Sequence, residues 1–149
     1  MSVVIMRGIP GGGKTTWIQT HYPASEVIVN SADDYPDYKT TRKWVFNPKL
    51  LPAAHRYCQD LFLKNLRFLE VDTLIVDNTN IHAWEIAFYY QLASLYDQEV
   101  KIVRLHCRPE IAFKRQTHGV SLKQLLDMHQ RLMEEKLPPF WNEEVYLSE

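Results

Sequence analysis

The sequence predicts one α/β domain with a parallel sheet of about four to five strands and helices on both faces. Its 149 residues, 46% hydrophobic and 23% charged, suit a single globular domain, residues 1–149. Its short apolar runs are continuous rather than alternating, which is typical of strands covered on both faces. Segments with helical spacing lie between these runs, and right-handed crossovers then give a parallel sheet.

Four segments are expected to form strands and five to form helices. The expected strands are Ser2–Met6, Val27–Asn30, Thr73–Asp77 and Val100–His106. The expected helices cover residues 14–21, 50–69, 83–96 and 109–116, with a fifth that begins after Ser121. Pro109 suits a first helical position, and Ser121 suits an N-cap.

Three stretches are expected outside this framework. The least regular one, residues 33–47, is interpreted as a substrate loop. Residues 108–121 lie around the junction of two expected helices, where a small helical lid would sit. Residues 137–149 begin with two prolines and are expected to form a surface tail.

A phosphate-binding motif follows the first expected strand directly. Residues 8–15 read GIPGGGKT, a full match to G-x-x-x-x-G-K-[ST] with a strand before it and a helix after it. Its glycines let successive N–H groups point at one phosphate, and the next helix presents its positive end to the same anion. ATP and Mg²⁺ are therefore the expected cofactors. The nucleotide-binding residues would be Gly8, Pro10, Gly11, Gly12, Gly13, Lys14, Thr15 and Thr16.

Polar residues follow the other strands, and ligands gather outside the carboxyl ends of parallel strands. Asp77 is expected to support Mg²⁺ together with Thr15, although it could instead cap the next turn. The residue after it is Asn78 rather than a glutamate, which weakens an ATP-hydrolysis interpretation. Asn78 and Asn80 either contact substrate or hold that turn.

Phosphoryl transfer to an alcohol needs a carboxylate that accepts the hydroxyl proton. Asp33 is the expected base and Asp34 a substrate contact; the alternative for this pair is a turn or helix cap. Arg115 is expected to close on the phosphates, because residues 101–131 carry seven Lys or Arg against two acids. The alternative there is a solvated helix face.

Four stretches together resemble the polynucleotide-kinase-like branch of P-loop kinases. They are Gly8–Trp17, Asp33–Tyr35, Asp77–Asn80 and Lys114–Val120. That branch includes phage-type polynucleotide 5′-kinases and the kinase-like domain of NEDD4-binding proteins, and phage kinases that modify hydroxymethylated pyrimidines in DNA are similar. The resemblance implies ATP-dependent phosphorylation of a hydroxyl on DNA or RNA. It also implies nucleotide and Mg²⁺ binding by Lys14 and Thr15, a general base at Asp33 and a lid arginine at Arg115.

One position departs from that family. Phage-type end-healing kinases carry an arginine three positions after the first aspartate, where this chain has Pro36. Arg42 and Lys43 are the candidates to replace it, and Arg42 is an expected substrate contact. The aromatic residues of this stretch either stack on bases or pack the loop; they are Tyr35, Tyr38, Trp44 and Phe46.

Composition limits the other possibilities. No apolar run approaches the ~18 residues of a membrane helix, so no membrane partner and a cytoplasmic location are expected. Cys58 and Cys107 are interpreted as buried thiols. The net charge of −1 does not itself indicate nucleic-acid binding, so the evidence for such binding must come from a local basic region. A small-molecule or nucleoside kinase, and a non-catalytic nucleotide-dependent adaptor, are the alternative functions.

Overall fold

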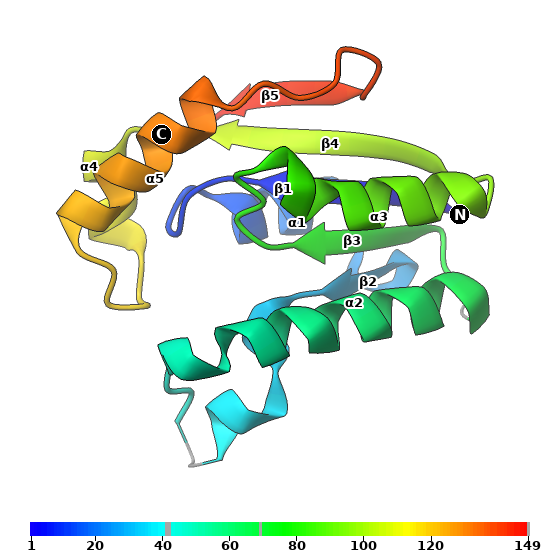
Figure 1. The fold of residues 1–149 in the computed structure, drawn as a ribbon, viewed down its shortest axis with the longest axis horizontal. Coiled ribbons are helices and arrows are strands. Elements are labelled where there is room, and N and C mark those ends of the chain that lie inside the picture. Colours follow the sequence, from blue (N-terminus) through cyan, green and yellow to red (C-terminus); the bar gives the residue numbers. More distant parts are fainter. Residues whose placement is uncertain (41–42, 69, 149) are drawn as a thin grey trace.

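The sheet has five parallel strands in the order β2-β3-β1-β4-β5 (Figure 1). This computed structural model describes residues 1–40, 43–68 and 70–148. The strands are β1 Ser2–Arg7, β2 Val27–Asn30, β3 Thr73–Asp77, β4 Glu99–His106 and β5 Glu143–Leu147. β1 is central: Ser2 is in register with Thr73 of β3 and with Glu99 of β4. Met6 is in register with Asp77, so the phosphate loop and Asp77 leave the sheet side by side.

The helices agree with the sequence to within two residues at each end. They are α1 Lys14–His21, α2 Leu51–Phe68, α3 Ala83–Leu95, α4 Pro109–Arg115 and α5 Leu122–Glu134. Short 3₁₀ turns cover Ala24–Glu26, Ala32–Asp34, Pro36–Lys39 and Pro48–Leu50. The cap at Ser121 is confirmed, because its Oγ accepts a hydrogen bond from the Gln124 N–H at 3.2 Å.

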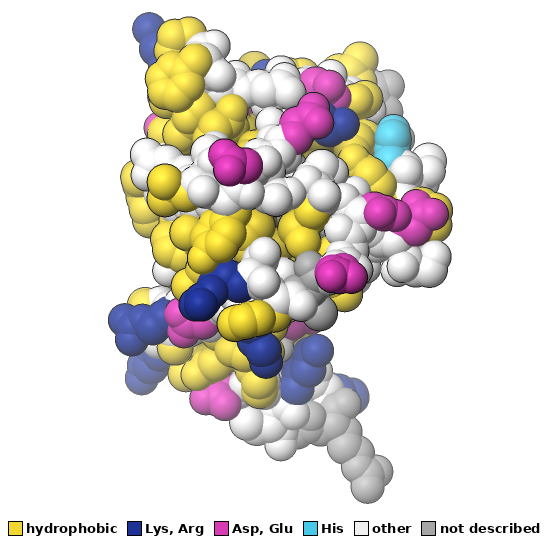
Figure 2. Space-filling model, turned by 90° about the vertical axis from the view of Figure 1, so that its right-hand side faces the viewer, with side chains coloured by type: hydrophobic (Ala, Val, Ile, Leu, Met, Phe, Trp, Pro, Cys, Tyr) yellow, Lys and Arg dark blue, Asp and Glu magenta, His cyan; other side chains and the backbone are white. Residues whose placement is uncertain are grey.

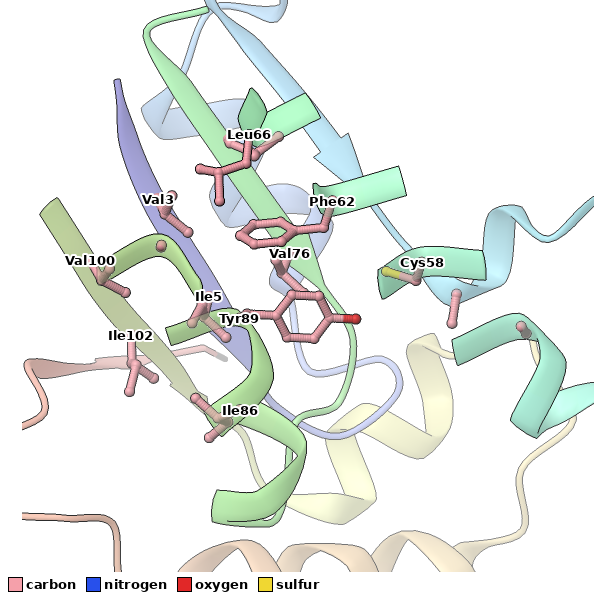
Figure 3. Close-up of a cluster of buried hydrophobic side chains, with 14 of the residues drawn as sticks. Val3, Ile5, Cys58, Phe62, Leu66, Val76, Ile86, Tyr89, Val100 and Ile102 are labelled. Atoms are coloured by element: carbon pink, nitrogen blue, oxygen red, sulfur yellow. The ribbon is translucent and has the colours of Figure 1, made fainter. Parts of the chain in front are cut away.

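Helices cover both faces of the sheet, as predicted. On one face, α2 and α3 bury side chains such as Phe62 and Tyr89 against Ile5 and Val76 (Figure 3). On the other face, Trp17 and Ile18 of α1 pack on alternate residues of the same strands. The lid helices α4 and α5 form a third cluster beyond the carboxyl ends of the strands, on the left of Figure 1. The α/β prediction is therefore confirmed.

The expectation of a surface tail over residues 137–149 is partly wrong, because Glu143–Leu147 form the edge strand β5. Arg7, at the end of β1, is 1% exposed, and its Nη1 donates to Glu143 of β5 at 2.6 Å. Its Nε and Nη2 donate to the carbonyls of Asn80 and Ile81 at 2.7 and 2.6 Å. A buried arginine needs such partners, so this ion pair ties residues 137–148 to the centre of the sheet. The sequence carries little signal for this strand, because Pro138 and Pro139 precede it and its first two residues, Glu143 and Glu144, are acidic.

The structure also bears on the expectation of no membrane helix and on the two cysteines. In the described residues, no helix has the length and apolar character required to span a bilayer. Cys58 and Cys107 are both buried, as expected.

Candidate active site

A cleft of about 990 Å³ opens at the carboxyl ends of the strands. Its walls come from the phosphate loop, the ends of β2 and β3, the start of α2, the lid and the end of β5. The expected site residues that line it are Pro10, Gly11, Gly12, Gly13, Lys14, Thr15, Thr16, Asp33, Asp77, Asn78 and Arg115. Expected site residues from four separate parts of the chain thus share one solvent-accessible cavity. Gly8 lies beneath it, where its N–H donates to the Thr79 carbonyl at 3.0 Å.

The phosphate loop has the backbone that its glycines permit. Gly11 and Gly13 have φ of 76° and 96°, in the region that favours glycine. Lys14 Nζ donates to the carbonyls of Gly8 and Ile9 at 2.9 and 3.3 Å. Burial lowers the pKa of Lys14, and the carboxylates of Asp77 and Asp33 oppose that shift. The ammonium therefore lies on the loop, close to two negative charges, at the base of the cleft.

Asp77 and Thr15 fit a Mg²⁺ site that the nucleotide would complete. Burial raises the pKa of Asp77, Lys14 lowers it, and the charges of Asp33 and Asp34 raise it further. A cation beside these carboxylates would offset that repulsion. The described residues contain no cluster of three or more His, Cys, Asp or Glu that could hold a metal alone. One carboxylate and one hydroxyl completed by phosphate oxygens and water is the arrangement that Mg²⁺ prefers.

The structure separates the two adjacent aspartates. Asp33 lines the cleft, and its main chain is held at both ends: its N–H donates to Ser31 Oγ at 3.2 Å, and its carbonyl accepts from Trp44 Nε1 at 2.8 Å. Asp34 does not line the cleft; its carboxylate pairs with Lys39 at 3.6 Å. The structure therefore places Asp33, and not Asp34, in the wall of the cleft.

The two asparagines after β3 hold the backbone. Asn78 Oδ1 accepts from the Ala32 N–H at 2.9 Å, so Asn78 joins the end of β3 to the residue before Asp33 while also lining the cleft. Asn80 is 2% exposed, has φ of 46° and donates from Nδ2 to the Met6 carbonyl at 2.8 Å. The expected substrate contact at Asn80 is thus not supported, because its amide supports the strand that leads into the phosphate loop.

The lid contacts two other parts of the chain near the cleft. Arg115 Nη1 donates to Ser148 Oγ at 3.1 Å, and the Ser148 N–H donates to the His106 carbonyl at 2.9 Å. The His118 ring meets Trp44 edge-on at 4.8 Å, so the lid touches the loop that carries Asp33. Arg115 is exposed and lies within reach of the cleft, as a side chain that closes on phosphates must.

Sequence reasoning missed part of the cleft wall, and one expected residue lies outside the described residues. Phe46, one of the aromatic residues expected to stack on bases or pack the loop, lines the cavity, and so does His118 of the expected lid. The missed residues include Leu51, His55, Glu85 and Ser148. Helical spacing placed Leu51 and His55 in a helix, but Glu85 and Ser148 carried no signal without the fold. Arg42 is not among the residues that the structure describes.

Residues 3–132 match the family described as AAA domain (AAA_33). The chain belongs to this family. It is also 28% identical over 141 residues to NEDD4-binding protein 2 of Homo sapiens, an alignment that covers 88% of this chain and 8% of that protein. The chain thus spans less than a tenth of that relative's length. These matches confirm the resemblance to P-loop kinases on which the site residues were expected.

Solved structures share the fold. A sugar kinase from Janibacter sp. HTCC2649 superposes with a TM-score of 0.64 at 16% identity, covering 99% of this chain and 85% of that one. A chain of the Pnkp1/Rnl/Hen1 RNA repair complex gives a TM-score of 0.69 at 13% identity, covering 89% and 44%. At these identities the similarity shows the fold alone, which is P-loop kinase-like.

Proposed function

We propose that this protein is a Mg-ATP-dependent kinase that transfers the γ-phosphate to a hydroxyl group of a nucleic acid, at a 5′ end or on a hydroxymethylated base in DNA. One observation carries the chemistry: Lys14, Asp33 and Arg115 line the same cleft although they come from separate parts of the chain. The family supports nucleotide use and phosphotransfer. The nucleic-acid acceptor rests on the resemblance to polynucleotide kinases and on local charge.

Each group has a distinct role in the proposed transfer. Asp33 aligns the acceptor hydroxyl and takes its proton as the hydroxyl oxygen bonds to the γ-phosphorus. The bond between that phosphorus and the β,γ-bridging oxygen breaks, and ADP leaves. Lys14 binds the β- and γ-phosphate oxygens, and Arg115 neutralises charge from the lid side. Thr15 and Asp77 would hold Mg²⁺, which would supply further charge neutralisation on the phosphates.

The acceptor is tested with radiolabelled ATP and three kinds of compound: 5′-hydroxyl oligonucleotides, duplex DNA that contains hydroxymethylpyrimidines, and free nucleosides or sugars. Label in either nucleic acid and none in the small molecules is the expected result. Label in the small molecules alone would overturn the nucleic-acid acceptor. No label in any of them, with ATP bound, would favour a non-catalytic adaptor.

The adjacent aspartates provide a matched test of the chemistry. Asp33→Asn is expected to lower turnover by about 10²-fold or more, the scale of a lost general base, with ATP affinity little changed. Asp34→Asn removes the same charge one residue away and should change turnover less than threefold, since its carboxylate faces Lys39. A larger loss in Asp34→Asn would refute the assignment of the base. Lys14→Ala should abolish transfer, and full activity in that variant would refute the phosphate site.

One observation favours a small-molecule acceptor as the second candidate. Among the described residues that line the cleft, Lys14 and Arg115 are the only lysine and arginine, and the proposed transfer assigns both to the phosphates. A neutral alcohol would fit such a cleft. The same panel of acceptors distinguishes the two candidates.

A further inference from the structure

The region between the substrate loop and the end of α2 is strongly basic. Residues 39–67 contain seven Lys or Arg and one acid, Asp60, in a chain whose net charge is −1. Most of the Lys and Arg side chains visible in Figure 2 lie in its lower half, the level at which Figure 1 places α2. Positive charge is therefore concentrated on one part of a nearly neutral molecule.

The charges of α2 form a stripe. Arg56, Lys64 and Arg67 are all exposed, and at 100° per residue they fall within about 80° of the helix circumference. Lys49 is exposed just before the helix. The α2 basic face consists of these four residues: Lys49, Arg56, Lys64 and Arg67. From Arg56 to Arg67 the helix rises about 16 Å, enough to face several phosphates, which are spaced ~3.4 Å apart along a duplex strand.

In the described part of the chain, the cations of this face lack the carboxylate partners that part of the other basic stretch has. Of the seven cations within residues 101–131, three have carboxylate partners: Lys101, Arg104 and Arg131, at 3.6, 3.7 and 3.1 Å. Among the described residues, none of the four cations of the α2 basic face has a carboxylate within 4.0 Å. Asp60 lies within the stripe without pairing to its neighbours. The charge of this face is therefore available to an external polyanion.

The helix that carries the α2 basic face begins at the cleft and ends at an exposed aromatic ring. Leu51 and His55, in its first turns, line the cleft from positions about 140° and 100° around the helix from Arg56. At the other end, Phe68 is 70% exposed, and the guanidinium carbon of Arg67 lies 5.0 Å from its ring centroid. An aromatic ring beside cations along a groove is the combination that binds single strands, by stacking and by backbone contacts.

We infer that the α2 basic face binds the sugar-phosphate backbone of a single-stranded nucleic acid, whose reactive end enters the cleft at Leu51 and His55. This inference rests on the proposed function for the role of the strand, but the binding itself does not need phosphotransfer. It explains how an acceptor could be nucleic acid although the described lining of the cleft has no lysine or arginine beyond Lys14 and Arg115. The strand would be held along α2, outside the cleft.

The test measures binding of a fluorescent 20-nucleotide single-stranded DNA over a range of salt concentrations. Lys64→Ala/Arg67→Ala is compared with Arg108→Ala/Lys136→Ala, which removes the same charge from exposed positions outside α2 and the cleft. Each lost phosphate contact lowers the slope of log K against log salt by about 0.7 for single strands. The α2 variant should lose about 1.4 in slope and about 25-fold in affinity at 0.1 M salt. Asp60→Asn should tighten binding.

The outcomes separate this inference from the proposed function. Equal losses in the two double variants, with melting temperatures unchanged, would overturn the α2 basic face and leave the kinase proposal intact. A selective loss in the α2 variant without phosphorylation of any oligonucleotide would support the face and refute the nucleic-acid acceptor. If oligonucleotides are phosphorylated, the α2 variant should raise KM for the 20-mer by about the same factor as its loss in affinity. It should leave kcat unchanged.

Discussion

Gly11 lets the phosphate loop and the lid approach one another, and replacing it should separate them. A Cβ at Gly11 would lie 2.3 Å from the carbonyl oxygen of Ala112 and 2.9 Å from Cβ of Gln116, both on or next to α4. An ordinary contact begins near 3.4 Å, so this end of α4 would have to retreat by about 1 Å. The φ of 76° adds backbone strain for any side chain.

The expected magnitude follows from these two costs. Strain in the left-handed region costs about 1–2 kcal/mol, and overpacking typically costs about 1–3 kcal/mol, so Gly11→Ala should destabilise by about 2–5 kcal/mol. Gly119→Ala is the matched control, because Gly119 has nearly the same φ of 75° and nothing within 4 Å of its added Cβ. That variant should lose only about 1–2 kcal/mol.

Thermal and denaturant unfolding measure the difference, and ATP titration measures its effect on the site. At about 3 °C per kcal/mol for a domain of this size, Gly11→Ala should lower the melting temperature by roughly 6–15 °C and Gly119→Ala by roughly 3–6 °C. Gly11→Ala should also weaken ATP binding, since the loop N–H groups shift with it. Equal effects of the two variants would show that the lid does not pack on the phosphate loop.

Two further predictions concern groups outside the cleft. Glu143→Gln should lower the free energy of unfolding by about 2–4 kcal/mol, because it leaves the buried Arg7 without its countercharge. Glu144→Gln breaks only the half-exposed pair with Lys101 and should cost at most ~1 kcal/mol. Urea unfolding of both variants measures the difference, and equal losses would contradict the prediction. Burial and the ring of His106 at 5.6 Å lower the pKa of His129. The unfolded chain therefore binds a proton that the folded chain resists, so His129 should reduce stability as the pH falls below its ordinary value near 6.5. His129→Gln should lessen the fall in melting temperature between pH 7.5 and 5.5; an unchanged fall would exclude this histidine.

The sequence predicted the framework because local signals and global topology agree in it. The four apolar runs, Pro109 at a first helical position and the Ser121 cap define elements whose bounds agree with the structure to within a residue or two. The motif G-x-x-x-x-G-K-[ST] needs only its strand and helix. β5 was not predicted because two adjacent glutamates, Glu143 and Glu144, are typical of a solvated surface. Glu143 is stabilised by Arg7, which lies 136 positions away in the chain.

The site was predictable where a residue follows a strand, and less so where function depends on side-chain direction. Asp33 and Asp34 are adjacent in sequence, and only the fold shows that Asp34 pairs with Lys39 and does not line the cleft. In the same way, Asn78 and Asn80 share a motif, but the left-handed backbone of Asn80 turns its amide into the protein. Such choices depend on tertiary contacts that no spacing encodes.

The central position of β1 has a consequence for synthesis on the ribosome. The strand that carries the phosphate loop is made first, but its two neighbours in the sheet begin at Thr73 and Glu99. Until His106, the last residue of β4, has emerged, the chain therefore lacks one whole side of the support for that loop. Ribosome-bound chains should bind ATP only after β4 has left the exit tunnel. ATP binding would therefore show when, during translation, β4 pairs with β1.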